Sequence, residues 1–136
     1  MKTFLTIIAA LIFGVALGRA VIFGAEAVIS TQTVSGGRVT AKVTYLNPTS
    51  GDDLRFAVVL DTHSVNLDGY DLKALSVLRD ARGKDYLPLR AENKGSGHHR
   101  EITLIFPKIA PDSKRIEIVI KDIAGVKERT FRWNLE

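Results

Sequence analysis

The chain of 136 residues contains no cysteine. Disulfide bonds, thiolate metal sites, iron–sulfur clusters, cysteine nucleophiles and a lipid-bearing N-terminal cysteine are therefore excluded. The absence does not fix the compartment, because many exported domains lack cysteine. Histidine is scarce as well, with three residues, so each one can be considered individually.

Concentrated charge is also missing. The net charge of +4 is spread along the chain, and no five consecutive residues carry the same sign. A nucleic-acid-binding surface would show Lys and Arg clustered on one element with interleaved aromatic residues. We therefore expect no nucleic-acid partner.

Motifs for catalysis are lacking too. There is no glycine-flanked serine of the nucleophile-elbow type. The pair Gly36-Gly37 precedes a strand pattern rather than a helix, so it does not form a phosphate-binding loop. We expect no enzymatic activity.

A long apolar run occurs at the N-terminus. Lys2 precedes Phe4–Leu17, a run of about 14 residues interrupted only by a threonine and a glycine. This length suits the core of a signal peptide, which spans roughly 7–15 residues. Ala25-Glu26-Ala27 supplies the small-x-small pattern that a signal peptidase accepts. We predict that residues 1–27 form a signal peptide.

The alternative is an uncleaved membrane anchor from Phe4 to Phe23, close to the roughly 20 residues that a span requires. Arg19 would lie inside this span, at a cost of about 2.5–3.5 kcal/mol on insertion scales. Both interpretations place residues 28–136 outside the cytoplasm, in the periplasm, on the cell surface or in the medium. We expect contact with a membrane only if the N-terminal segment stays uncleaved.

Beyond residue 28, apolar residues alternate with a period of two, which is typical of half-buried strands. The clearest segments are 39–45, 54–60, 102–106, 116–120 and 131–135. Leu72–Arg79 and Tyr86–Arg90 are further predicted strands, the second following a hairpin turn at Asp80–Asp85. We predict one domain over residues 28–136, an all-β, antiparallel, immunoglobulin-like β-sandwich of about seven or eight strands. An eight-stranded barrel is the alternative.

Two loops carry the chemically versatile side chains. Leu54–Asp71 begins as a strand and ends among donors of electron pairs, which are Asp61, His63, Asn66, Asp68 and Asp71. Gly95–Glu101 carries the other two histidines, His98 and His99. If the alternate residues of strand 54–60 face the core, Asp61 and His63 point outward together, about 6.5–7 Å apart along the chain. We expect the two loops to meet at one end of the sandwich.

This arrangement suggests a metal site. His63, His98 and His99 would bind zinc or copper, and Asp61 would act as a fourth ligand or would orient a ring. The opposing interpretation is that these histidines are surface or structural groups, since adjacent histidines in an exposed, glycine-rich loop need no metal. Asn66–Asp71 resembles a fragment of a calcium loop but lacks the bidentate glutamate, and its residues are also ordinary turn formers.

Three functions remain open at this stage. The first is an exported, non-catalytic binding module with a protein partner at the cell envelope. The second is an extracytoplasmic metal-binding domain that uses the histidines named above. The third is a structural subunit that assembles through edge strands, for which Val28–Val34 is a candidate because it is uncharged and rich in β-branched residues.

Overall fold

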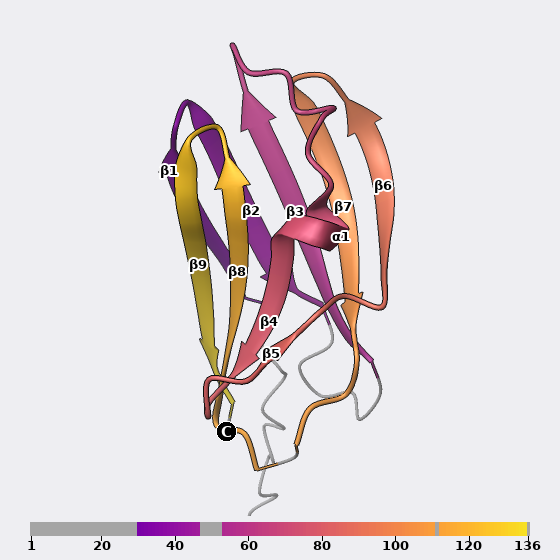
Figure 1. Ribbon diagram of the computed structural model, residues 1–136, viewed down its shortest axis with the longest axis vertical. Helices are drawn as coiled ribbons and strands as arrows, with labels where there is room; N and C mark the ends of the chain where they lie inside the picture. The colour runs from indigo at the N-terminus through magenta and orange to yellow at the C-terminus, as the bar shows by residue number, and fades with distance from the viewer. Residues whose placement is uncertain (1–29, 47–52, 111, 136) are drawn as a thin grey trace, which may run out of the picture.

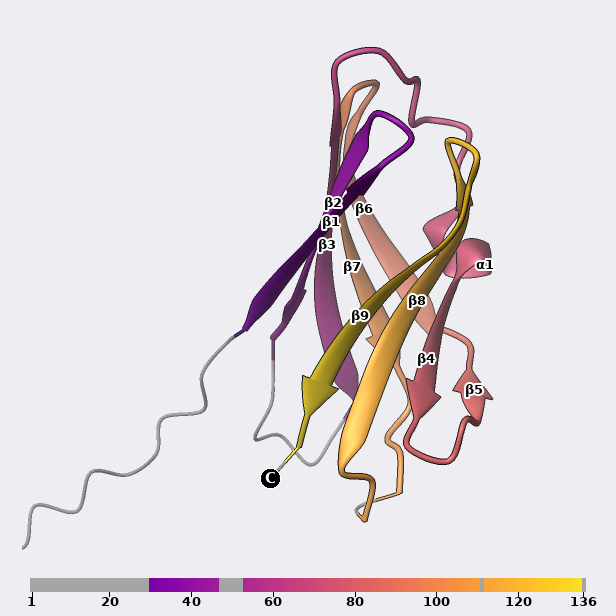
Figure 2. The same cartoon turned by 90° about the vertical axis from the view of Figure 1, so that its left-hand side faces the viewer.

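The computed structural model describes residues 30–46, 53–110 and 112–135. Within these ranges, nine strands form two antiparallel sheets, and the chain also contains one short helix (Figures 1 and 2). The predicted signal peptide or anchor, residues 1–27, lies outside the described residues. None of the helical structure within the described ranges is long and apolar enough to cross a membrane.

The larger sheet has five strands and the smaller has four. The five-stranded sheet has the spatial order β1 (Thr31–Gly36), β2 (Val39–Tyr45), β3 (Leu54–Thr62), β7 (His99–Phe106) and β6 (Arg90–Ser96). The four-stranded sheet has the order β5 (Asp85–Tyr86), β4 (Ser76–Asp80), β8 (Arg115–Ile123) and β9 (Val126–Asn134). The helix α1 (Leu72–Leu75) immediately precedes β4. The predicted all-β architecture of two sheets is therefore confirmed.

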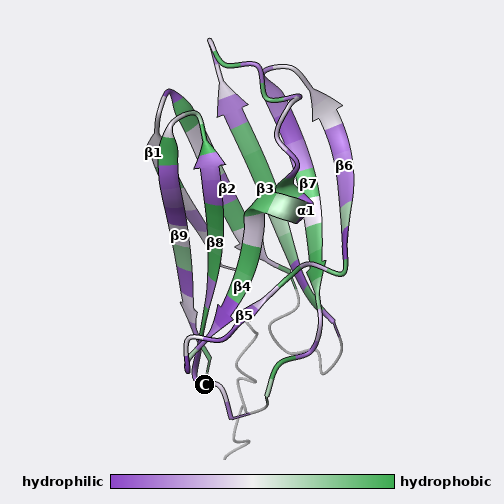
Figure 3. Cartoon of the chain, viewed as in Figure 1, coloured by the Kyte–Doolittle hydropathy of each residue, from purple (hydrophilic) through white to green (hydrophobic). Residues whose placement is uncertain are grey.

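The core lies between the sheets and is built by the alternation that the sequence displays. Along β2 and β3, every second residue is buried and apolar, whereas Lys42 and Arg55 lie exposed on the other face. Figure 3 colours these strands by the hydropathy of each residue. Phe56 lies at the centre of an aromatic cluster, with its ring centroid 4.8 Å from Tyr45, 5.3 Å from Trp133 and 5.9 Å from Phe106. Burying each such side chain contributes about 1.5–3 kcal/mol, so this cluster joins the sheets strongly.

Strand β6 is a departure from the sequence prediction, which placed a strand at Tyr86–Arg90 and a loop from Gly95 onward. Apart from Ala91, every residue of β6 is exposed, so the strand has no apolar face for a period-two pattern to reveal. The count of nine strands exceeds the predicted seven or eight because of this strand. The eight-stranded barrel is wrong, since the strands form two separate sheets with edges.

The segment Leu72–Arg79, predicted as one strand, begins instead as a helical turn. Asp71 caps this turn: its Oδ1 accepts from the N–H of Lys73 at 3.0 Å, and its carbonyl accepts from the N–H groups of Ala74 and Leu75. Only the second half of the segment is the strand β4. The predicted turn between Asp80 and Asp85 is present and leads into the short β5.

Candidate functional site

Four connections gather at one end of the sandwich, at the top of Figure 1, and we call this the loop end. They are the β1–β2 turn (residues 37–38), the β3–α1 loop (residues 63–71), the β6–β7 turn (residues 97–98) and the β8–β9 turn (residues 124–125). Both loops that the sequence singled out lie here, because β3 and β7 are direct neighbours in the sheet. The expected proximity of the two loops is therefore present.

Arg100 fastens the β3–α1 loop to the β6–β7 hairpin. It occupies an inward position on β7 and is 8% exposed. Its Nη1 donates to the carbonyls of Leu67 at 2.8 Å and Tyr70 at 2.6 Å, and its Nη2 donates to Oδ1 of Asn93 at 2.7 Å. One buried guanidinium thus holds two points of an irregular loop.

Asp68 adds a second attachment between the same two segments. Its Oδ1 accepts from the N–H of Gly97 at 2.7 Å, and the N–H of Leu67 donates to the Gly97 carbonyl at 2.9 Å. The Leu67 side chain is fully buried in the core. Asn66 Oδ1 accepts from the N–H of Asp68, so Asn66 and Asp68 both serve backbone amides in the manner of turn-forming residues.

Arg129 and Tyr70 connect the remaining pieces. Arg129 faces inward on β9 and donates to the carbonyls of Ile123 at 3.0 Å and Gly36 at 2.6 Å. Burial lowers the pKa of Arg129. The Tyr70 hydroxyl accepts from the N–H of Ala124 at 3.0 Å. These bonds join the β8–β9 turn to the β1–β2 hairpin and to the β3–α1 loop.

Thr62 links the β1–β2 turn to the β6–β7 turn. Its hydroxyl donates to the Arg38 carbonyl at 2.6 Å, and its N–H donates to the His98 carbonyl at 3.0 Å. The β1–β2 turn also lies against the β8–β9 turn so closely that a side chain at Gly37 would come within 2.3 Å of the Ala124 carbonyl oxygen. A closed ring of hydrogen bonds therefore links all four connections of the loop end.

Two of the predicted site residues meet directly on the outer face of the five-stranded sheet. Asp61 and His99 are register partners on β3 and β7, and the Asp61 carboxylate contacts Nδ1 of the imidazole. Glu101 Oε1 lies 3.3 Å from the other ring nitrogen, Nε2. The hydrogen bond with Asp61 is the main cause that raises the pKa of His99, followed by the bond with Glu101.

The structure does not add the other two histidines to this contact. His63 and His98 are exposed, and neither side chain makes a hydrogen bond with another described residue. His63 lines an open hollow of about 260 Å³ together with Arg38, Thr40, Asp61 and Thr62. Across residues 30–46, 53–110 and 112–135, no three His, Asp or Glu side chains are grouped so that they could hold a metal ion. Metal binding by His63, His98, His99 and Asp61 stays a prediction.

Sequence reasoning missed the two buried arginines. A signal was present: Arg100 stands at an inward position two residues before Ile102, and Arg129 stands two residues before Phe131. A charged residue in register with a buried apolar face must find partners, because an unpaired buried charge is costly. The partners themselves were not visible in the sequence, since most of them are backbone carbonyls.

Comparison with known proteins identifies no relative. No family model, curated protein or solved structure matches this chain.

Proposed function

We propose that this chain is an exported, non-catalytic module with an immunoglobulin-like arrangement of its two sheets, and that its loop end binds a protein partner at the cell envelope. The observation that carries the proposal is the ring of hydrogen bonds through Thr62, Asp68, Tyr70, Arg100 and Arg129. A binding surface that is ordered in advance avoids the cost of ordering on association, about 0.5–1.5 kcal/mol for each immobilised side chain.

The connections of the loop end differ in length, and the longest one favours recognition of a partner. Three of them are tight two-residue turns, whereas the β3–α1 loop runs from His63 to Asp71. Loops on a rigid scaffold are where binding residues concentrate. Here the buried Arg100 holds a loop whose exposed side chains include His63 and Ser64. Beside them lies exposed His98, so the surface offers both donors and acceptors to a partner.

The path of the chain supports display of this surface. Ser30, the first described residue, precedes β1 at the opposite end of the sandwich, and β1 runs from there toward the loop end (Figure 2). The N-terminal segment therefore joins the domain far from His63 and His98.

Site-specific photocrosslinking in the producing cells tests the proposal. A benzophenone amino acid replaces His63 or His98 in the full chain, and Thr130 or Asn134, exposed on β9, in matched controls. We expect an adduct of one discrete mass from the loop-end positions and none from the controls. Equal adducts from all four positions, no adduct at the loop end, or a chain retained in the cytoplasm would contradict the proposal.

A zinc or copper site is the second candidate function. The contact between Asp61 and His99 favours it, because a carboxylate commonly orients a metal-ligating imidazole through its second nitrogen. Calorimetric titration of the metal-free protein with zinc or copper, and thermal melts with and without a chelator, test this candidate. It predicts saturable binding that is lost in His63→Ala and His99→Ala; a melt that no metal shifts would exclude it.

A further inference from the structure

The five-stranded sheet ends in two strands that differ in chemistry. The edge strand β6 carries Arg90, Glu92 and Lys94, and Gly95 interrupts its regular backbone with a φ of 81°. Charges and irregular backbone are the features that keep exposed edges from pairing. The opposite edge strand, β1, has the sequence TQTVSG, with no charge and no proline. Of the two edges, β1 is therefore the one without protection.

The backbone of β1 directs some of its N–H and C=O groups away from β2. The Tyr45 N–H donates to the Ser30 carbonyl at 3.3 Å, which sets the phase of the ladder between β1 and β2. In an antiparallel pair, alternate residues exchange hydrogen bonds with the neighbour and the residues between them direct N–H and C=O groups away. In β1, the backbone N–H and C=O groups of Thr31, Thr33 and Ser35 therefore point away from β2. Among the described strands, β1 pairs only with β2.

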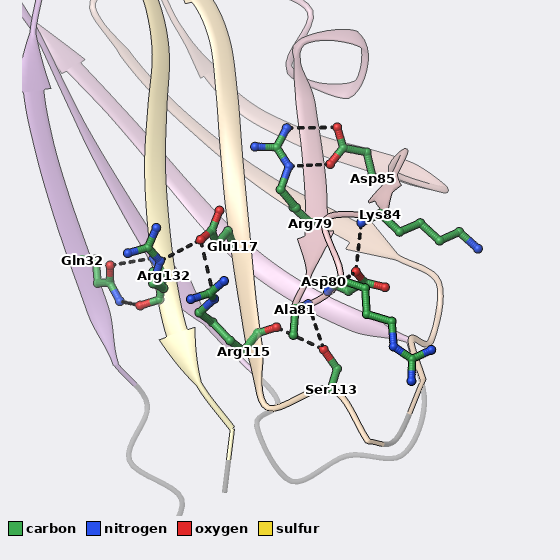
Figure 4. Close-up of polar contacts among 11 residues, drawn as sticks. Gln32, Arg79, Asp80, Ala81, Lys84, Asp85, Ser113, Arg115, Glu117 and Arg132 are labelled. Carbon is green, nitrogen blue, oxygen red and sulfur yellow. Dashed lines mark hydrogen bonds and ion pairs between the residues drawn. The ribbon is translucent and has the colours of Figure 1, made fainter.

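The neighbouring edge strand of the other sheet, β9, is capped in a way that β1 is not. The side-chain amide of Gln32 accepts from the Arg132 N–H at 2.9 Å and donates to the Arg132 carbonyl, as a paired strand would (Figure 4). The guanidinium of Arg132 is bound to Glu117 at 2.7 Å. On this side of the sandwich, β1 thus covers part of the β9 edge, and none of the described strands covers the edge of β1.

We propose that β1 pairs antiparallel with β1 of a second copy of this chain, with the two-fold axis at Thr33. Thr31 of each copy then lies opposite Ser35 of the other, and the contact is self-complementary, as a two-fold interface requires. The proposal is independent of the loop end. Antiparallel pairing directs the two loop ends in opposite directions.

Charge permits this pairing. The nearest cation on the same face is Lys42, which lies beside Thr33 on β2. In the order β2–β1–β1–β2, three strand spacings separate the two Lys42 residues, about 14 Å. This exceeds the Debye length of about 8 Å at physiological ionic strength. The same construction with β6 would place Arg90, Glu92 and Lys94 directly in the interface.

Light scattering coupled to gel filtration tests the proposal on the full chain, expressed in cells that export it and purified in the form they deliver. We expect a mass that rises toward that of a dimer with concentration. Thr33→Pro removes an N–H that points out of the sheet, so it breaks the contact between copies without removing a β1–β2 hydrogen bond. Thr33→Lys places two like charges together at the two-fold axis. Both variants should raise the dissociation constant at least tenfold.

Two controls separate this result from other causes. Glu92→Gln on β6 changes the net charge by the same +1 as Thr33→Lys, and it should dimerise like the wild type. His63→Ala should also dimerise normally, so failure at the loop end is distinguishable from failure at β1. A monomer at all concentrations up to about 1 mM, a limit near −4.1 kcal/mol, would overturn the proposal. The proposal would also be overturned if Thr33→Lys dimerised with wild-type affinity, or if the wild type formed open-ended assemblies instead of dimers.

Discussion

Arg100 and Arg129 invite comparison because both are arginines buried at the loop end, yet they are satisfied differently. Arg100 makes three hydrogen bonds, two of them to carbonyls of the irregular β3–α1 loop. Arg129 makes two, and its Nε has no partner among the described residues. Arg129 is also the more deeply buried, at 1% exposure against 8%.

Burial alone does not rank the contributions of the two arginines to stability, because the contribution depends on whether their acceptors have other donors. Gly36 and Ile123, which accept from Arg129, each precede a two-residue turn. The carbonyl at this position of a β-turn often accepts a second hydrogen bond, from the N–H three residues further on. The Tyr70 carbonyl lies in a loop, where Arg100 is its one donor among the described residues. We therefore expect the less buried arginine to matter more.

Replacing each arginine with methionine tests this ranking and carries the largest expected effect. Arg100→Met should lower the free energy of unfolding by about 1–3 kcal/mol, the cost of one buried acceptor left without a donor. That acceptor is the Tyr70 carbonyl, since the Leu67 carbonyl keeps the N–H of Tyr70 at 3.3 Å and Asn93 is exposed. Arg129→Met should change it by less than about 1 kcal/mol, since it also removes a buried Nε–H that has no partner among the described residues. Urea denaturation measures both values. A larger loss of unfolding free energy in Arg129→Met than in Arg100→Met would contradict this ranking.

Tyr70 contacts both regions, because its carbonyl accepts from Arg100 and its hydroxyl accepts from the N–H of Ala124. Tyr70→Phe removes the second of these bonds alone. The variant leaves the Ala124 N–H without its acceptor, so we expect a loss of about 1 kcal/mol. Exchange of the Ala124 amide hydrogen should become faster while the Tyr70 carbonyl stays bound to Arg100. Tyr86→Phe is the matched control, because it removes a hydroxyl that donates to Asp80 in the β4–β5 hairpin. Slow exchange at Ala124 in Tyr70→Phe would show that the loop and the turn are joined by other contacts.

The sequence revealed most of the fold because most strands have one buried face. The alternation in β2, β3, β7, β8 and β9 follows directly from packing against one core. Strand β6 was missed because only Ala91 of its residues packs against the core, and the strand is held mainly by its backbone bonds to β7. The helical turn α1 was missed because a cap at Asp71 overrides the β-branched character of its surroundings.

The candidate site could be predicted in part. The expectation that the two loops meet at one end of the sandwich is met, and the pairing of β3 with β7 brings Asp61 and His99 together. Sequence spacing could not show that His63 and His98, both exposed, have no hydrogen-bonding partners among the described side chains. Nor could it locate the carbonyls that surround Arg100, since their positions depend on the course of the whole loop.

The smallest effect is expected at His99, which extends the comparison from buried cations to an exposed one. Its pKa is raised, first by the hydrogen bond with Asp61 and then by Glu101. A group whose pKa is higher in the folded chain stabilises the fold fully below its unfolded value, near 6.5, and this contribution is lost as pH rises through the folded value. Because the ring is about half exposed, the contribution is screened by solvent.

Asp61→Asn tests this assignment. In an NMR titration, the midpoint of the His99 imidazole should move down toward its ordinary value, because the principal carboxylate partner is gone. The melting temperature of the wild type should fall slightly between pH 5.5 and pH 8.5, and that of Asp61→Asn should fall less. Asp68→Asn is the control, since Asp68 accepts from the Gly97 N–H and not from the ring. If the His99 midpoint were unchanged in Asp61→Asn, Asp61 would not be its main partner, and the carboxylate that orients the ring in the metal-site hypothesis would be lost as well.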